Sequence, residues 1–247
     1  MAKLRLDKFL ADQGLASRTQ LRDMIRVGRV SVNGIPVRKP EEKIDTETDL
    51  VTMDGARVGS ELLHTLMMDK PVGVVCATED KSEKTVLDLL PAEYRRMGLS
   101  PVGRLDKDTS GLLLLSNDGE FLHRVISPKS AVEKCYCASI EGEPTEEDVK
   151  AFREGLVLRD GTECLPAKLE LLGEGKCLVY VTEGKYHQVR RMLASRGFPV
   201  IALKRLSIGA LKLDESLAPG AWKELNREDL CRVFRGTNMG NLSKEQL

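Results

Sequence analysis

Positive charge gathers at the start of this chain, and the asymmetry divides the sequence into two parts. Residues 1–40 contain nine lysines and arginines against three acids, a balance of +6, whereas the 247 residues together have no net charge. The remaining 207 residues therefore carry −6. A basic module attached to a mildly acidic body is typical of a tethered unit that binds a polyanion. We expect a small nucleic-acid-binding domain followed by a larger domain.

The basic segment has the pattern of two helices and a hairpin. A stripe of apolar residues predicts a short helix over residues 4–13. The run Ser17-Arg-Thr-Gln20 has the form of a capping box, which would begin a second helix at Arg18, and Gly28 would end it. The pair Asn33-Gly34 lies between short apolar runs and predicts a hairpin turn.

Arginines on the second predicted helix form one basic face. Arg18, Arg22 and Arg26 are spaced four residues apart, so they point the same way. Asp23 is the one acid among them, so pairing within the helix is incomplete, and the charge geometry favours RNA binding over a merely solvated face. We assign RNA binding to six basic residues of this segment: Arg5, Lys8, Arg18, Arg22, Arg26 and Arg29.

Metal, membrane and export signals are missing from the sequence. The six cysteines include no C-x-x-C pair and only three histidines accompany them, so we expect no metal. No apolar stretch approaches the ~20 residues of a membrane span, and the N-terminus lacks a signal-peptide pattern. We expect a cytoplasmic protein with reduced thiols.

The larger part reads as α+β. The apolar run 112–115 predicts a buried strand, residues 145–154 and 187–195 predict helices, and residues 84–90 predict a short helix before Pro91. Hairpin signals outnumber β-α-β alternations, which favours a mainly antiparallel or mixed sheet flanked by helices. Further strands are expected at 167–172, 177–182, 199–203 and 206–213, and domains at 1–60 and 61–236 with a disordered tail at 237–247.

Three polar segments interrupt the apolar surroundings of the larger part. The first runs from Gly103 to Gly111, directly before the strand predicted at 112–115. An arginine and two acids on a loop that enters a buried strand favour a functional carboxylate. A turn in which Asp106 or Asp108 caps backbone amides fits the same spacing equally well.

The other two segments are weaker signals when taken alone. Lys134 and Tyr136 fall on one face of a strand, where a tyrosine is more often half-buried packing. Gly184 precedes a helix rich in histidine, glutamine and arginine, which indicates an anionic partner near its first turn. A solvated helix face is the alternative, and it is the better interpretation of Arg191. His187 by itself fits a satisfied polar residue.

Motifs of the basic segment resemble a known RNA-binding module. They are Leu6-Asp-Lys-Phe-Leu10, Ser17-Arg18 and Ile25-Arg-Val-Gly-Arg-Val-Ser-Val-Asn-Gly34. The segment is similar to the S4 domain, which occurs in ribosomal proteins and RNA-modifying enzymes.

Motifs of the larger part follow one another over residues 62–226. They are Lys70-Pro-Val-Gly73, Gly103-Arg-Leu-Asp106-x-x-Thr109-x-Gly-Leu-Leu-Leu, Ser127-Pro-Lys, Lys134-x-Tyr136, Gly184-Lys-Tyr-His-Gln-Val-Arg190-Arg-Met, and Ile208-Gly with Leu217-Ala-Pro-Gly220-Ala-Trp222. Together they resemble the ribosomal-RNA pseudouridine synthases related to the bacterial small-subunit enzyme. The resemblance implies an S4-like module followed by a pseudouridine synthase domain.

The resemblance also implies a reaction and a set of site residues. The enzyme would isomerise uridine to pseudouridine with no cofactor or metal, using Asp106 as the nucleophile and Arg190 as its partner cation. Tyr136 would pack against the uracil, and Arg104 would help to hold the flipped base. The catalytic set is then Asp106, Tyr136 and Arg190, and the substrate-binding set is Arg104, Thr109, Lys134 and Lys185.

The expected partner is ribosomal RNA, free or in an assembling subunit, bound by a monomer. The form Lys-Tyr-His-Gln at 185–188 is more similar to the small-subunit branch of this family than to its large-subunit branch, and this resemblance implies a target in 16S rRNA. The alternatives are a synthase for 23S rRNA and a non-catalytic S4-type assembly factor. A hydrolase using Asp106 with His187 would lack any nucleophile-elbow or triad spacing.

Overall fold

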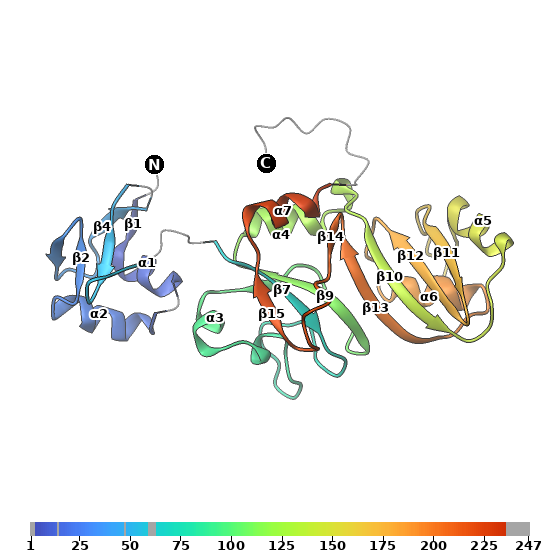
Figure 1. Cartoon of the computed structure of the whole chain (residues 1–247), viewed down its shortest axis with the longest axis horizontal. Coiled ribbons are helices and arrows are strands. Elements are labelled where there is room, and N and C mark those ends of the chain that lie inside the picture. Colours follow the sequence, from blue (N-terminus) through green and yellow to red (C-terminus); the bar gives the residue numbers. More distant parts are fainter. Residues whose placement is uncertain (1–2, 14, 47, 59–62, 236–247) are drawn as a thin grey trace. The chain divides into compact units, whose positions relative to one another are not determined.

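The computed structural model describes residues 3–13, 15–46, 48–58 and 63–235 (Figure 1). Contacts divide the chain into two compact units, residues 1–64 with 87–100 and residues 65–86 with 101–247, and each is described by itself. The tail predicted at 237–247 lies outside the described residues.

Two helices and short strands build the first unit around an apolar core. The predicted capping box is confirmed, because the backbone N–H of Gln20 donates to the Ser17 hydroxyl and the Gln20 side chain accepts from Ser17 N–H. The predicted hairpin is confirmed as well, with Asn33 and Gly34 both at positive φ between paired strands. The elements are β1 (Lys3–Arg5), α1 (Leu6–Asp12), α2 (Arg18–Arg26), β2 (Val30–Val32), β3 (Ile35–Val37), β4 (Lys43–Asp45), β5 (Val51–Met53) and β6 (Ala56–Arg57).

Strand pairing in this unit gives one four-stranded sheet in the order β3-β2-β5-β6 and a separate pair, β1 with β4. Residues 87–100, which belong to the same unit, hold a 3-10 turn, η1 (Leu87–Leu89), and α3 (Ala92–Arg96). The helix predicted at 84–90 is therefore shorter than expected. Thr85 forms an isolated parallel bridge with Val75, which keeps the start of the segment extended.

One mixed sheet is the framework of the second unit. Its main strand order is β11-β12-β10-β13-β9-β7-β15, with β14 beside β13. The pair β13–β9 is parallel, whereas the other pairs along this order are antiparallel, so the predicted α+β class with a mixed sheet is confirmed. The strands are β7 (Thr65–Lys70), β9 (Thr109–Ser116), β10 (Lys134–Ile140), β11 (Lys168–Gly173), β12 (Lys176–Val181), β13 (Val200–Ile208), β14 (Leu211–Lys212) and β15 (Trp222–Glu224); short β8 (Ser100–Pro101) spans the boundary between the units.

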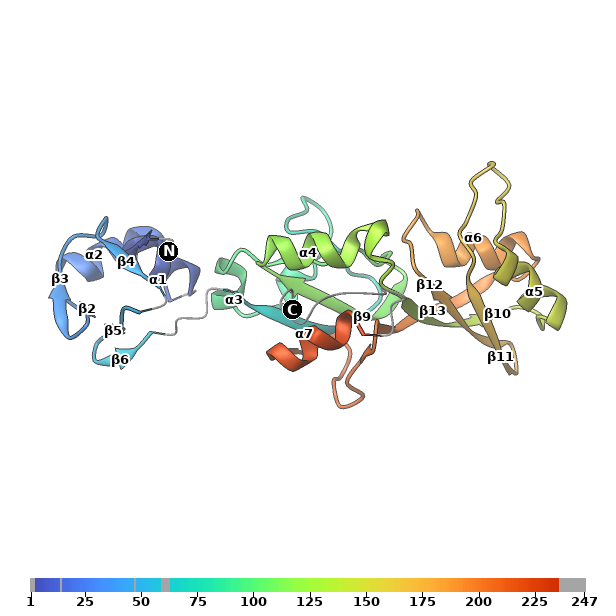
Figure 2. The same ribbon diagram turned by 90° about the horizontal axis from the view of Figure 1, so that it is seen from above.

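Helices cover this sheet in two places. Figure 2 shows α6 (Gln188–Ser195) along the face of β10, β12 and β13, where its apolar side joins one core cluster together with α5 (Glu146–Glu154). The helices α4 (Gly119–Ile126) and α7 (Arg227–Val233) pack on β7 and β9, and Phe121 meets Phe234 edge to face at 5.8 Å. A 3-10 turn, η2 (Pro128–Ser130), follows α4.

One sequence prediction for the strands of this unit needed correction. The strands expected at 199–203 and 206–213 are one continuous strand to Ile208, because residues 200–208 pair with β10 along its length, with two shifts of register in that pairing. The turn comes later, at Gly209, where an added Cβ would lie 2.0 Å from the Val233 carbonyl oxygen. Around Asp160-Gly161 the chain makes a tight turn, in which the N–H of Leu158 donates to the Thr162 carbonyl at 2.9 Å and Val157 forms an antiparallel bridge with Glu163.

Candidate active site and RNA-binding surface

A buried lysine holds the loop that carries Asp106. Lys70 ends strand β7 with its side chain fully buried. Its ammonium group donates hydrogen bonds to the carbonyls of Pro71 at 3.0 Å, Asp106 at 3.1 Å and Thr109 at 2.8 Å. These three bonds match the three donors of an ammonium group, although burial lowers the pKa of Lys70. The backbone of the loop from Asp106 to Thr109 is thereby fixed.

A glycine lets strand β9 approach its parallel partner β13. Gly111 has a φ of +102°, and a Cβ at this position would lie 2.2 Å from the carbonyl oxygen of Arg205. Any larger residue would force the two strands apart. Gly111 therefore sets the distance between the loop before β9 and the side chains of β13.

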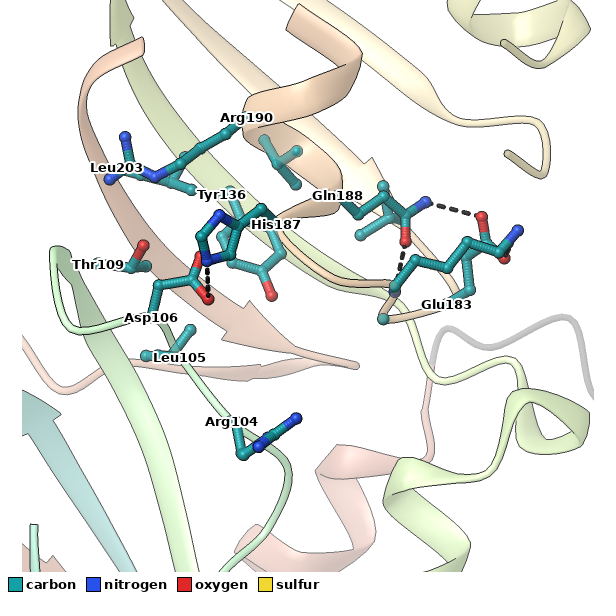
Figure 3. A pocket seen from close by; sticks show the side chains of 14 residues that line it. Arg104, Leu105, Asp106, Thr109, Tyr136, Glu183, His187, Gln188, Arg190 and Leu203 are labelled. Atoms are coloured by element: carbon teal, nitrogen blue, oxygen red, sulfur yellow. Dashed lines mark hydrogen bonds and ion pairs between the residues drawn. The ribbon is translucent and has the colours of Figure 1, made fainter. Parts of the chain in front are cut away.

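Most of the predicted catalytic and substrate-binding residues line one pocket of the second unit (Figure 3). Asp106 comes from the loop before β9, Tyr136 from β10 and Arg190 from α6. The Asp106 side chain is 31% exposed, so its carboxylate remains open to the pocket. The pocket residues are Arg104, Leu105, Asp106, Thr109, Tyr136, Val181, Glu183, Gly184, Lys185, His187, Gln188, Val189, Arg190 and Leu203.

Lys134 is not among the residues that line this pocket, although the family resemblance implied it for the substrate-binding set. It lies two residues before Tyr136 on β10. Burial, with a smaller contribution from the charge of Arg205, lowers the pKa of Lys134 to about 8. Lys134 is thus a partly buried cation beside the pocket.

The group next to the Asp106 carboxylate is a histidine and not the expected arginine. The Nε2 atom of His187 lies 3.4 Å from Oδ1 of Asp106 (Figure 3). Arg190 instead pairs with Oδ2 of Asp108 at 2.8 Å and donates to the carbonyls of Asp108 and Val200. The expected Arg190–Asp106 pair is therefore corrected: Arg190 holds the loop two residues after Asp106.

Arg205 contributes to the site and was not found from the sequence. It is 3% exposed, and its Nε donates to the carbonyl of Leu112 at 2.7 Å. Its Nη1 lies 3.4 Å from the hydroxyl of Tyr136, and the guanidinium stands 5.9 Å from the centre of that ring. Arg205 fell between two separately predicted strands, so no pattern indicated that it faces Tyr136.

The turn between β12 and α6 is fixed by buried polar side chains. Gln188 donates to Glu183 at 2.7 Å and accepts from the backbone N–H of Lys185 at 3.0 Å. The ammonium group of Lys185 pairs with Glu183 at 2.9 Å. Both Glu183 and Gln188 are buried, so the turn enters the pocket with little freedom.

The arginine face of the first unit is organised by one buried acid. Asp7 has no exposed side-chain surface, and its carboxylate pairs with Arg5 at 3.0 Å, Arg18 at 3.1 Å and Arg22 at 3.0 Å. Burial alone would raise the pKa of Asp7, but the hydrogen bonds from the three guanidinium groups outweigh it and hold the pKa well below its usual range. Each of the three arginines remains 43–47% exposed.

More arginines of this face are therefore paired with acidic side chains than the spacing along the helix indicated. The other two predicted arginines also have acidic partners, Arg26 with Asp23 at 3.2 Å and Arg29 with Asp54. The partner of Arg18 and Arg22 is Asp7 on the preceding helix, which no spacing rule within one helix reveals. Three arginines around one carboxylate still leave a local charge of +2.

Within the described ranges, no group of three or more histidines, cysteines or acids is arranged to hold a metal ion. A separate search of the same residues found no helix of sufficient length and hydropathy to cross a membrane.

Comparison with known proteins agrees with this architecture. Residues 64–195 match the family model for RNA pseudouridylate synthase, and residues 4–51 match the S4 domain. An uncharacterised RNA pseudouridine synthase of Bacillus subtilis is 42% identical over 92% of this chain and 97% of its own. The ribosomal small subunit pseudouridine synthase A of Vibrio cholerae is 39% identical over 94% of this chain and all of its own. A crystal structure of a pseudouridylate synthase superposes with a TM-score of 0.66 at 35% identity, covering 93% of this chain and 99% of that one. The chain belongs to the RNA pseudouridine synthase family and carries an S4 domain in front of the synthase domain.

Proposed function

We propose that this RNA pseudouridine synthase converts a specific uridine of 16S ribosomal RNA into pseudouridine, with Asp106 as the nucleophile. The target is supported by relatives named ribosomal small subunit pseudouridine synthase A. The match to one of these relatives covers 94% of this chain and the whole of the relative. The nucleophile is supported by the position of Asp106, the one aspartate among the residues that line the pocket.

The reaction needs a group that can bond to carbon and leave again. Isomerisation breaks the bond between ribose C1′ and uracil N1, turns the uracil and forms a bond between C1′ and C5; C5 loses a proton and N1 gains one, so no atoms are lost overall. A carboxylate oxygen can form such a transient bond to carbon and leave again. Asp106 suits this step because Lys70 fixes its backbone while the carboxylate stays open to the pocket.

The neighbouring side chains would hold the substrate and the loop. Tyr136 would pack against the uracil, with its hydroxyl held by Arg205. Arg190 would act through Asp108, because that ion pair steadies the loop of Asp106. The target base must leave its helix to reach this pocket, and Arg104 at the pocket wall would help to hold it there. Thr109 and Lys185, which also line the pocket, would complete the substrate-binding set.

The S4 domain would supply affinity for the RNA backbone. The arginines held by Asp7 would bind phosphates as a group, because they are half-exposed and fixed relative to one another. Lys8 is exposed on the helix that carries Asp7, so it would add a phosphate contact. Arg26 and Arg29, each paired with an acid, would complete the RNA-binding set.

The observation that carries the proposal is the grouping of Asp106, Tyr136 and Arg190 around one pocket. It is tested by treating unmodified 16S and 23S rRNA with the purified protein and mapping pseudouridine chemically on both. We expect one modified uridine, in 16S rRNA. Pseudouridine in 23S rRNA alone would show that the substrate is the large-subunit RNA. Absence of pseudouridine from both RNAs, free or in subunit particles, would contradict the proposal.

A further inference from the structure

We propose that the rings of Tyr186 and His187 form a second nucleobase site, on which an unpaired base next to the target uridine stacks. This proposal rests on the proposed function, since it supplies a place for a neighbour of the flipped nucleotide. The site lies beside the pocket, because His187 lines the pocket and Tyr186 directly precedes it.

The two rings already form a stack. Their centroids are 3.9 Å apart and their planes are inclined by 16°. Tyr186 is 74% exposed, which makes it the most exposed large apolar side chain of the described residues. The His187 ring therefore covers one face of the Tyr186 ring, while Tyr186 still offers an aromatic surface to solvent. A flat aromatic surface of this kind accepts any base, because every base has a π-face.

Backbone geometry indicates that this arrangement is held in place. His187 has a φ of 48° in the left-handed region, which costs a non-glycine residue of order 1 kcal/mol or more. It precedes helix α6, yet its side chain makes no capping hydrogen bond. Its Nε2 instead lies 3.4 Å from the carboxylate of Asp106. The strained backbone thus directs the imidazole to the proposed nucleophile and places Tyr186 on its outer side.

Neighbouring contacts hold the backbone at the exposed tyrosine. Nη1 of Arg191 donates to the carbonyl oxygen of Tyr186 at 3.2 Å, and Arg191 is itself paired with Asp160 at 2.5 Å. On the other side, the N–H of Lys185 is bound by the buried Gln188. An exposed aromatic ring on a fixed backbone loses little conformational entropy when a ligand stacks on it.

The chemistry of base flipping supplies the ligand. When a uridine leaves its helix, the bases beside it lose a stacking partner. Single-stranded RNA is commonly held by stacking of such bases on tyrosine or histidine. The ring pair lies next to the carboxylate that would receive the flipped uracil, so a flanking base would reach it within one nucleotide of the target.

The experiment places a reporter at the stacking surface. Tyr186→Trp adds a second tryptophan to a chain that has one, Trp222, and the wild-type protein gives the baseline emission. The probes are an oligouridylate of eight nucleotides and an oligomer of the same length and charge whose sugars carry no bases. We expect oligouridylate to quench the added emission and the abasic oligomer to leave it unchanged. Equal responses to both oligomers, or no quenching beyond the wild-type baseline, would overturn the proposal.

Matched variants test the contribution to binding. Tyr186→Ala should bind oligouridylate about 5- to 100-fold more weakly, whereas Tyr186→Phe should stay within about twofold of wild type. Val157→Ala removes another exposed side chain, 68% exposed and outside the pocket, and should bind like wild type. Wild-type affinity in Tyr186→Ala, or equal losses in the Phe and Ala variants, would also refute ring stacking.

Assays of rRNA modification run in parallel separate the two proposals. If the wild-type protein makes pseudouridine and Tyr186→Ala does so with unchanged KM, the stacking site fails and the proposed function stands. If base-dependent quenching persists in a protein that modifies no rRNA, the nucleobase site stands and the proposed function fails.

Discussion

The most demanding prediction concerns Asp7, the buried acid of the S4 domain. Asp7→Asn keeps the size of the side chain and removes the charge that Arg5, Arg18 and Arg22 share. Five hydrogen bonds from these guanidinium groups reach the carboxylate, at 3.0 to 3.3 Å. Losing one partner of a buried ion pair costs about 3–5 kcal/mol. The arginines here are nearly half-exposed and can be rehydrated, so we expect a loss of about 2–3 kcal/mol.

The same change tests the role of this acid in RNA binding. The variant is more positive by one charge, so a purely electrostatic account predicts tighter binding. We expect weaker binding and a flatter salt dependence, because the arginines lose the carboxylate that fixes their positions. Unchanged or tighter binding would refute the idea that Asp7 arranges these arginines for RNA.

Acid should reduce the stability difference between the two proteins. Because the pKa of Asp7 is held well below its usual range, its contribution is complete above the ordinary carboxyl pKa of about 3.9 and is lost progressively as the pH falls from that value toward the lowered folded pKa. Hydrogen–deuterium exchange of peptides from residues 15–46 in the full chain measures the local free energy of opening at pH 7 and at pH 3.5. Since the folded pKa lies well below 3.5, we expect the difference to shrink by about 0.7 kcal/mol at the lower pH, and a difference as large at pH 3.5 as at pH 7 would contradict the assignment.

A matched control is available on the same face. Asp23 pairs with Arg26 at 3.2 Å, with both side chains more than 60% exposed. Asp23→Asn adds the same charge as Asp7→Asn but should cost at most about 1 kcal/mol. Equal effects of the two substitutions would show that burial of Asp7 is irrelevant.

Three further predictions concern the synthase domain. Gly111→Ala should destabilise it by more than about 3 kcal/mol in thermal unfolding, because the Cβ would meet the Arg205 carbonyl at 2.2 Å, and a Tm within two degrees of wild type would contradict this. Lys70→Met should lower kcat more than it changes KM, since the loop of Asp106 loses three hydrogen bonds, and an unchanged kcat would remove Lys70 from the positioning role. Lys134 has a folded pKa of about 8, below its unfolded value of about 10.4, so its burial penalty disappears as the pH rises from 8 to 10.4. Over that pH interval the free energy of unfolding of the wild-type protein should increase by on the order of 3 kcal/mol relative to that of Lys134→Met. Parallel pH profiles of the two proteins would contradict the burial of Lys134.

Local patterns predicted the elements whose causes are local. The capping box at Ser17, the turn at Asn33-Gly34 and the buried strand at 112–115 depend on residues close together in the sequence, and all three are present. The family resemblance implied that Asp106, Tyr136 and Arg190 belong to one catalytic set, and in the structure they line one pocket.

The contacts that escaped prediction join residues distant in the sequence. Arg18 and Arg22 find Asp7 eleven and fifteen positions away, across two helices. Lys70 reaches carbonyls of Asp106 and Thr109 only because β7 and β9 are neighbours in the sheet. Residue periodicity describes faces of single elements, so it cannot say which buried charge an opposing element supplies.

The pairing of Arg190 with Asp108 has the same origin. Asp106 and Asp108 are two residues apart on one loop, and both carboxylates were available to an arginine on α6. The left-handed backbone of His187 gives this histidine the place beside Asp106. A conformation that the residue type does not favour could not be expected from composition or spacing.

The central claim is tested most directly by Asp106→Asn, which retains the shape of the side chain and removes its nucleophilic oxygen. Single-turnover isomerisation of 16S rRNA and RNA affinity are measured on the same preparation. We expect no detectable pseudouridine at protein concentrations that saturate the RNA, with affinity within about threefold of wild type, a change below about 0.7 kcal/mol. Turnover near the wild-type rate would contradict the assignment of Asp106 as the group that attacks the nucleotide.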